Sequence, residues 1–141
     1  MPTSFSRINY KELTARQKEN YNFQKISGVL AEYGFVTLRL TDDWENADFI
    51  AQNIDGETLL KVQLKARLTF QQKYIGKSLF IAFPEEEEWY LYPHDEVLDR
   101  ISEISGLKYS NAWKKSGIRH FKKIPIKYKD LLREYRIFPY L

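Results

Sequence analysis

Three polar residues in the first half of the chain have the types needed for phosphodiester hydrolysis: Asp48, Gln63 and Lys65. A carboxylate and an amide supply the oxygen ligands that hard divalent cations prefer. A cation held in this way polarises a phosphate and activates a water molecule. A neighbouring lysine orients the nucleophile or stabilises the charge that develops on the phosphorus. These residues form a site only if the fold brings their side chains together.

The segment DFIAQNIDGETLLKVQLKAR, residues 48–67, is predicted to be a β-hairpin. Its strands are expected at 47–54 and 57–69, because Asp-Gly at 55–56 is a strong signal for a two-residue turn. One face of this hairpin is apolar and is expected in the core. It carries Phe49, Ala51, Leu60, Val62, Leu64, Ala66 and Leu68.

The other face of the hairpin carries the polar residues. A two-residue turn makes the numbers of facing positions sum to 111, so Asp48 lies opposite Gln63, with Cβ atoms about 5 Å apart. Lys65 follows two residues further along this face, which Lys61 and Arg67 share. An ordinary hairpin with one solvated face explains the same pattern. A slip of one residue in the register would also remove the Asp48–Gln63 pairing.

The remaining pattern predicts an α+β domain around a mainly antiparallel sheet. A single domain spans residues 1–141, with its core at about 14–92. Residues 42–46 are expected to form a loop, and 107–126 an irregular segment. The predicted elements are a helix from Thr14 to Gly34, strands at 35–41, 47–54, 57–69, 79–83 and 89–92, a helix at 95–105 and a short helix at 128–135.

The charge is unevenly distributed along the chain. The overall net charge is +3, but residues 42–106 carry six basic and fourteen acidic groups, whereas 107–141 carry ten basic and two acidic groups. This asymmetry predicts a basic surface for an anionic polymer, DNA in particular. A solvated basic tail packed by its own aromatic residues is the alternative. The predicted DNA-binding residues are Lys61, Arg67, Lys114, Lys115, Arg119, Lys122 and Lys123.

At the hairpin the chain resembles the PD-(D/E)xK nuclease superfamily. Ala47-Asp48 stands for the Pro-Asp of that motif, and Gln63-Leu64-Lys65 for its second half. The preceding LAEYGF, residues 30–35, is similar to the helix end before the first strand of the family. The resemblance covers residues 14–83 and implies a restriction-endonuclease-like core, a helix followed by a three-stranded antiparallel meander. The missing Pro, the Gln in place of Glu and the lack of a helix after the third strand depart from the family.

The resemblance implies a role for each residue at the site. Asp48 would be the principal ligand of Mg²⁺, or of Mn²⁺ as a substitute. Gln63 and the main-chain carbonyl of Leu64 would assist it, and Lys65 would be the catalytic lysine. A Glu on the first helix often completes the family's site. Glu19 is the candidate here, and Gln24 is a weaker one; a solvated position on the helix explains Glu19 equally well.

These observations lead to two readings of function. The first is a Mg²⁺-dependent DNA endonuclease, for which a homodimer would supply the second site needed to cut both strands. The second is a nuclease-fold module that binds nucleic acid or protein without catalysis. The chain has no Cys, no apolar leader and no membrane-length apolar run, which favours a cytoplasmic protein without membrane partners. His94 is expected to be structural, and Glu85–Glu88 a solvated turn.

Overall fold

The computed structural model describes residues 4–139, and its fold begins with helix α1, Ala15–Ala31. The side chain of Thr14 accepts a hydrogen bond from the backbone of Gln17, whose own side chain accepts one from the backbone of Thr14. This capping box satisfies backbone donors that a helix start leaves unpaired. Gly34, with φ of +82°, turns the chain after the helix. The predicted helix is confirmed, with Thr14 as its N-cap, and it ends at Ala31, three residues before Gly34.

Three antiparallel strands follow α1: β1 (Phe35–Trp44), β2 (Ala47–Asn53) and β3 (Leu59–Leu64). This is the order of helix and meander that the family resemblance implies. The β2–β3 register pairs Phe49 with Val62, so facing positions sum to 111, as predicted. The apolar face that requires this register is fully buried at both of these residues.

The turn between β2 and β3 is longer than the predicted two residues. It spans Ile54–Glu57, and the carboxylate of Asp55 accepts hydrogen bonds from the backbone of Glu57 at 2.7 Å and of Thr58 at 2.8 Å. A two-residue type I′ turn needs positive φ at both central residues. Of Asp55 and Gly56, only Gly56 has positive φ. The longer loop keeps the same register because it adds one residue to each side.

The other elements form the second half of the chain. A six-stranded sheet has the order β1-β2-β3-β5-β6-β8, in which β3 and β5 are the parallel pair, and β4 and β7 form a separate two-stranded sheet. Single-turn 3-10 helices lie at Tyr10–Glu12, Gln72–Tyr74 and Leu107–Tyr109. The remaining elements are β4 (Leu68–Gln71), β5 (Leu79–Glu85), β6 (Glu88–Pro93), α2 (His94–Ser105), α3 (Asn111–Ser116), β7 (Ile118–Phe121), α4 (Ile126–Arg133) and β8 (Arg136–Ile137).

Several predicted boundaries are wrong. The strand expected at 57–69 ends at Leu64, and after a break the chain enters β4 in the other sheet. The loop expected at 42–46 is reduced to a turn at Glu45-Asn46, because β1 extends to Trp44. The segment expected to be irregular at 107–126 contains α3 and β7. Pro84 and Glu85 lie within β5, and the short C-terminal helix begins two residues earlier and ends two residues earlier than expected.

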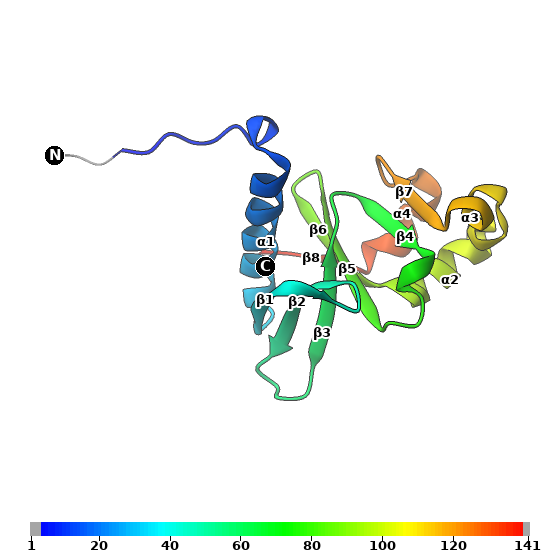
Figure 1. The fold of residues 1–141 in the computed structure, drawn as a ribbon, viewed down its shortest axis with the longest axis horizontal. Coiled ribbons are helices and arrows are strands. Elements are labelled where there is room, and N and C mark those ends of the chain that lie inside the picture. Colours follow the sequence, from blue (N-terminus) through cyan, green and yellow to red (C-terminus); the bar gives the residue numbers. More distant parts are fainter. Residues whose placement is uncertain (1–3, 140–141) are drawn as a thin grey trace.

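Two groups of buried residues cover the two faces of the large sheet. Helix α1 contributes Ile26, Val29 and Leu30 to one, where they pack with Phe49 and Val62 of the meander. The other contains buried residues of β5, β6, α2 and α4. Figure 1 shows α1 on one side of the sheet and the α2–α4 helices with β4 and β7 on the other. No helix within residues 4–139 is long and apolar enough to cross a membrane.

Candidate active site

Asp48 lies opposite an irregularity in strand β1. The β1–β2 register pairs Arg39 with Phe49 and then Trp44 with Ala47. Residues 40–43 of β1 therefore lie opposite a single residue of β2, Asp48. Extra residues on one strand interrupt the ladder and redirect nearby side chains, which is why bulges recur beside active sites. Here the irregularity opens a pocket of about 470 Å³. Its lining residues are Arg16, Glu19, Arg39, Leu40, Thr41, Asp42, Ala47 and Asp48. We call it the Asp48 pocket.

The carboxylate of Asp48 is fixed against the end of β3. Its Oδ2 accepts a hydrogen bond of 2.8 Å from the backbone N–H of Leu64. The paired residues of β2 and β3 end at Phe49 and Val62, and the same register continued by one residue sets Gln63 opposite Asp48. On its other side the backbone of Gln63 pairs with Ile81 of β5, so this position is held between two strands. The structure therefore places the carboxylate of Asp48 beside the backbone of the Gln63–Leu64 segment.

Lys65 directly follows β3 and is half-buried. Its backbone N–H donates to the carbonyl of Ala82 at 2.8 Å, and its ammonium lies 5.8 Å from the ring centroid of Tyr74. Burial lowers the pKa of Lys65; the charge of Asp48 opposes this shift, and that of Lys73 adds to it. A half-buried lysine with a lowered pKa next to a carboxylate is typical of functional sites.

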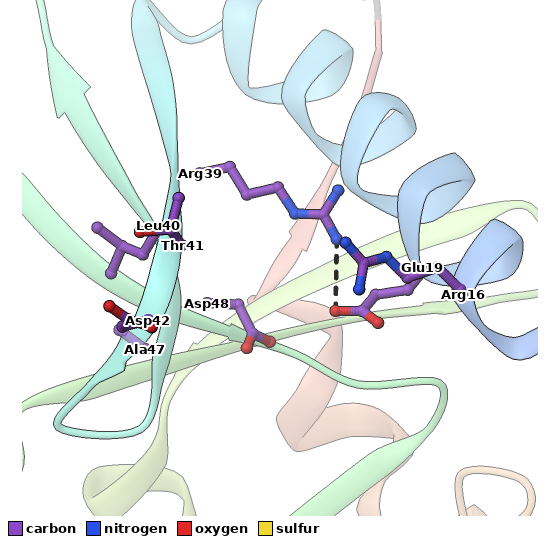
Figure 2. Close-up of a pocket in the computed structure, with 8 residues that line it drawn as sticks. All are labelled: Arg16, Glu19, Arg39, Leu40, Thr41, Asp42, Ala47 and Asp48. Carbon is purple, nitrogen blue, oxygen red and sulfur yellow. Dashed lines mark ion pairs between the residues drawn. The ribbon is translucent and has the colours of Figure 1, made fainter.

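Glu19 of α1 lines the Asp48 pocket from the helix side. Figure 2 shows its carboxylate and that of Asp48 pointing into the same space. Glu19 forms an ion pair of 3.4 Å with Arg39, and its side chain is 54% exposed. It is therefore available to other partners. Gln24, the weaker candidate, is exposed and does not line this pocket.

Sequence reasoning missed two arginines of this pocket. Arg39 reaches from β1 to Glu19 and to the side chain of Asn20, and Arg16 lies one helical turn before Glu19 (Figure 2). The spacing of Arg16 and Glu19, three residues apart on a helix, was a usable signal. Arg39 gave no such signal, because a basic residue at an alternate position of a strand is typical of any solvent-facing side chain.

The donor set decides how a cation would be held. Within residues 4–139, no group of three or more Asp, Glu, His or Cys side chains is arranged to hold a metal ion. The carboxylates that line the Asp48 pocket are those of Asp48, Glu19 and Asp42. Gln63 and Leu64 do not line this pocket, but the backbone of Leu64 is hydrogen-bonded to Asp48. Mg²⁺ typically binds one or two carboxylates and keeps waters and substrate oxygens as its other ligands. These residues fit such a cation.

The predicted DNA-binding residues occupy two regions. Lys61 forms an ion pair of 2.9 Å with Glu45 and lies over the ring of Trp44. Arg67 is exposed in the break after β3. The next residue, Leu68, pairs with Phe121 in the β4–β7 ladder, and this pairing places Arg67 next to Lys122. The ladder thus connects the exit of the hairpin to the basic segment. That segment exposes Lys114 and Lys115 of α3, Arg119 of β7, and Lys122 and Lys123 after it.

His94 and Glu85–Glu88 have structural partners. The Nε2 atom of His94, which is fully buried, accepts a hydrogen bond from the backbone of Gln71, and Nδ1 lies 2.8 Å from the Asp95 carboxylate. Helix α2 begins at His94, one residue before the start predicted at 95. Within the acidic segment, Glu86 and Glu87 form the β5–β6 turn, and the carboxylates of Glu85 and Glu88 hydrogen-bond within the protein.

Solved structures that are similar to this chain include a resolvase and an endonuclease. One is a Holliday junction resolvase, Hjc of Archaeoglobus fulgidus, at 16% identity and a TM-score of 0.40, over 50% of this chain and 74% of the resolvase. The other is the bacterial homing endonuclease I-Ssp6803I, at 18% identity and a TM-score of 0.48, over 87% of this chain and 86% of the endonuclease. No family model and no curated protein matches the sequence. At these identities and TM-scores, function is inferred from the geometry of the chain's own residues.

Proposed function

We propose that this protein is a Mg²⁺-dependent endonuclease that hydrolyses DNA phosphodiester bonds. The observation that carries the proposal is the hydrogen bond that joins the carboxylate of Asp48, at the start of β2, to the backbone of Leu64, the residue between Gln63 and Lys65. The β2–β3 register, the Asp48–Leu64 hydrogen bond and the lowered pKa of Lys65 all support it. The basic surface from Arg67 to Lys123 supports DNA as the polymer.

Each residue has a role in this proposal. Asp48, the side chain of Gln63 and the carbonyl of Leu64 would hold the cation, with Glu19 as a further ligand. The bound Mg²⁺ would supply polarisation of the phosphate and activation of the attacking water. Lys65 would place its ammonium against the charge that develops as the P–O bond breaks. Half-burial strengthens that interaction, because water screens the charge less.

The ion pair between Glu19 and Arg39 favours a second candidate function. It neutralises one of the three carboxylates of the pocket, the one on α1. Gln63 already removes a negative charge that the nuclease family normally has at this position. A protein with this arrangement can bind the phosphates of DNA through Arg16, Arg39 and the basic surface without cleaving them. This is the binding module without catalysis.

Cleavage of supercoiled plasmid distinguishes the two functions. The nuclease converts it to nicked or linear DNA with Mg²⁺ or Mn²⁺ but not with EDTA, and Asp48→Asn and Lys65→Met abolish this conversion. Metal-independent binding without nicking would establish the module instead. Nicking that survives in both variants would show that the site lies elsewhere.

Lys73→Met is the matched control for Lys65→Met. The ammonium groups of Lys73 and Lys65 lie at nearly the same distance from the ring of Tyr74, 5.7 Å and 5.8 Å. Loss of either therefore removes one positive charge from the same neighbourhood. The control should weaken DNA binding slightly and preserve cleavage at saturating protein.

A further inference from the structure

A second pocket adjoins the proposed catalytic site. Its volume is about 270 Å³, and it lies between the N-terminal half of α1 and the exit of β3. The two pockets share Glu19, and Lys65 lines the second one. A group bound in the second pocket would therefore touch the proposed catalytic lysine. We call it the Tyr10 pocket, after the aromatic residue that lines it from the N-terminal arm.

The two pockets differ in chemistry. The Asp48 pocket presents two arginines and three carboxylates, which suit a phosphate and a cation. The Tyr10 pocket has fewer charged groups, Lys18, Glu19 and Lys65, and its other lining residues are Tyr10, Ala15, Asn22, Leu64 and Ala66. Asn22 donates a hydrogen bond of 2.9 Å to the hydroxyl of Tyr10. An aromatic ring with apolar neighbours and one amide suits a flat heterocycle with polar edges.

We propose that the Tyr10 pocket receives a nucleobase that has left the helical stack, next to the phosphate that is cut. This inference rests on the proposed nuclease function and names its substrate class: DNA with an unpaired nucleotide beside the scissile bond. Small-molecule pockets span roughly 300–1,000 Å³. A pocket of about 270 Å³ is suited to one base rather than to a base pair. A base inside a duplex is covered by its neighbours and cannot enter a recess of this kind.

The surroundings of Tyr10 explain how a base would be held. The ring of Tyr10 lies 5.2 Å from that of Tyr21. The ammonium of Lys18 lies 5.4 Å from its centroid. Stacking of a base on Tyr10 would replace Lys18 above the ring, and the long Lys18 side chain can then pair with the phosphate of the same nucleotide. The sugar–phosphate chain would pass between the two pockets at Glu19 and Lys65.

Fluorescence of 2-aminopurine tests this without cleavage. The base analogue is placed as a single-nucleotide bulge in one duplex and fully paired in another, and the protein is added in EDTA. Stacking should quench the bulged analogue, and the bulged duplex should bind more tightly than the paired one. Tyr10→Ala should lower affinity for the bulged duplex about 5- to 150-fold, the range for removing a base–aromatic stack. Affinity for the paired duplex should stay unchanged.

Two variants separate stacking from other effects. Tyr10→Phe keeps the ring and should keep the preference for the bulge. Tyr109→Ala removes another tyrosine, 74% exposed and next to α3, and should change nothing. Equal binding of the two duplexes by the wild type, or an unaltered preference in Tyr10→Ala, would overturn the inference. Because the assay contains no metal, quenching without any plasmid cleavage would refute the nuclease proposal and leave the base pocket standing.

Discussion

The carboxylate of Asp48 accepts a hydrogen bond of 2.8 Å from the backbone N–H of Leu64, which ties the start of β2 to the end of β3. The bond crosses the hairpin at the point where the β2–β3 ladder ends. The same side chain also lines the pocket beside the β1 irregularity. One side chain therefore closes the hairpin and, in the proposed site, would also be the principal metal ligand.

Asp48→Ala should reduce stability as well as cleavage. A hydrogen bond to a charged group contributes about 1.5–3 kcal/mol, and the backbone N–H of Leu64 would lose its acceptor. We expect the free energy of unfolding to fall by about 2 kcal/mol, measured by urea denaturation. Asp48→Asn keeps an acceptor oxygen and should lose much less stability while still losing cleavage.

Asp42→Asn is the control for both Asp48 variants. Asp42 lines the same pocket from β1 but takes no part in the hydrogen bond between Asp48 and Leu64. Its replacement should leave stability within about 0.5 kcal/mol of the wild type, as for most surface changes. If Asp48→Asn and Asp42→Asn reduced cleavage equally, Asp48 would have no special role as a ligand.

Gln63→Glu should increase metal affinity and reduce stability in the absence of metal. The substitution places a second carboxylate opposite Asp48, and like charges facing each other across strands are destabilising. We expect a loss of up to about 1 kcal/mol in EDTA. Mn²⁺ binds the folded state and should restore the loss, since a ligand of the native state raises its stability. Calorimetric titration with Mn²⁺ and melting curves with and without the metal measure both effects.

Gln52→Glu is the matched control for this substitution. It makes the same change of charge on β2, but opposite Leu59 rather than opposite a carboxylate. It should therefore leave Mn²⁺ binding and the metal dependence of melting unchanged. Equal Mn²⁺ affinities of Gln63→Glu and the wild type would show that position 63 does not face the cation.

The hairpin register could be read from the sequence, and the shape of the pocket could not. Phe49 and Val62 must both be buried, and a shift of one residue would expose them, so the apolar pattern alone determines which polar residues face each other. The β1 irregularity has no comparable signal. Thr41 and Asp42 suit a loop as well as a strand, and the sequence analysis placed Thr41 at the end of a strand and Asp42 in a loop.

Contacts between residues that are distant in the sequence could not be predicted either. Leu68 pairs with Phe121. The N-terminal arm places Tyr10 beside Asn22 and the exit of β3. Neither contact has a local pattern, because tertiary packing selects it. The basic segment was recognised by its composition. Its link to Arg67, however, depends on the β4–β7 ladder.

The β5–β6 turn offers a stabilising substitution. Glu86 and Glu87 have φ of 51° and 67°, in the left-handed region that costs L-residues other than glycine roughly 1–2 kcal/mol each. Asn and Gly adopt these angles readily at the two positions of a type I′ turn. The double variant Glu86→Asn/Glu87→Gly should raise the free energy of unfolding by about 1–2 kcal/mol in urea denaturation. Asn46→Gly in the β1–β2 turn should gain less, because asparagine already tolerates this conformation.

Stability should decrease below about pH 6.5, the ordinary pKa of histidine, because of His94. Burial lowers the pKa of His94 in the folded protein, although the neighbouring Asp95 opposes the shift. At pH values below the unfolded pKa, the unfolded chain binds a proton that the folded chain does not, so its population grows as the pH falls. Protonation would also remove the acceptor for the backbone N–H of Gln71.

Urea denaturation between pH 5 and pH 8 should therefore show a slope in the wild type that His94→Asn reduces. His120→Asn, which removes the exposed histidine of β7, should retain the wild-type slope. If His94→Asn kept the full slope, carboxylates rather than His94 would control stability in this range. Lower stability of His94→Asn at every pH is expected as well, because the substitution leaves space beside the rings of Phe70 and Tyr74, which contact the imidazole.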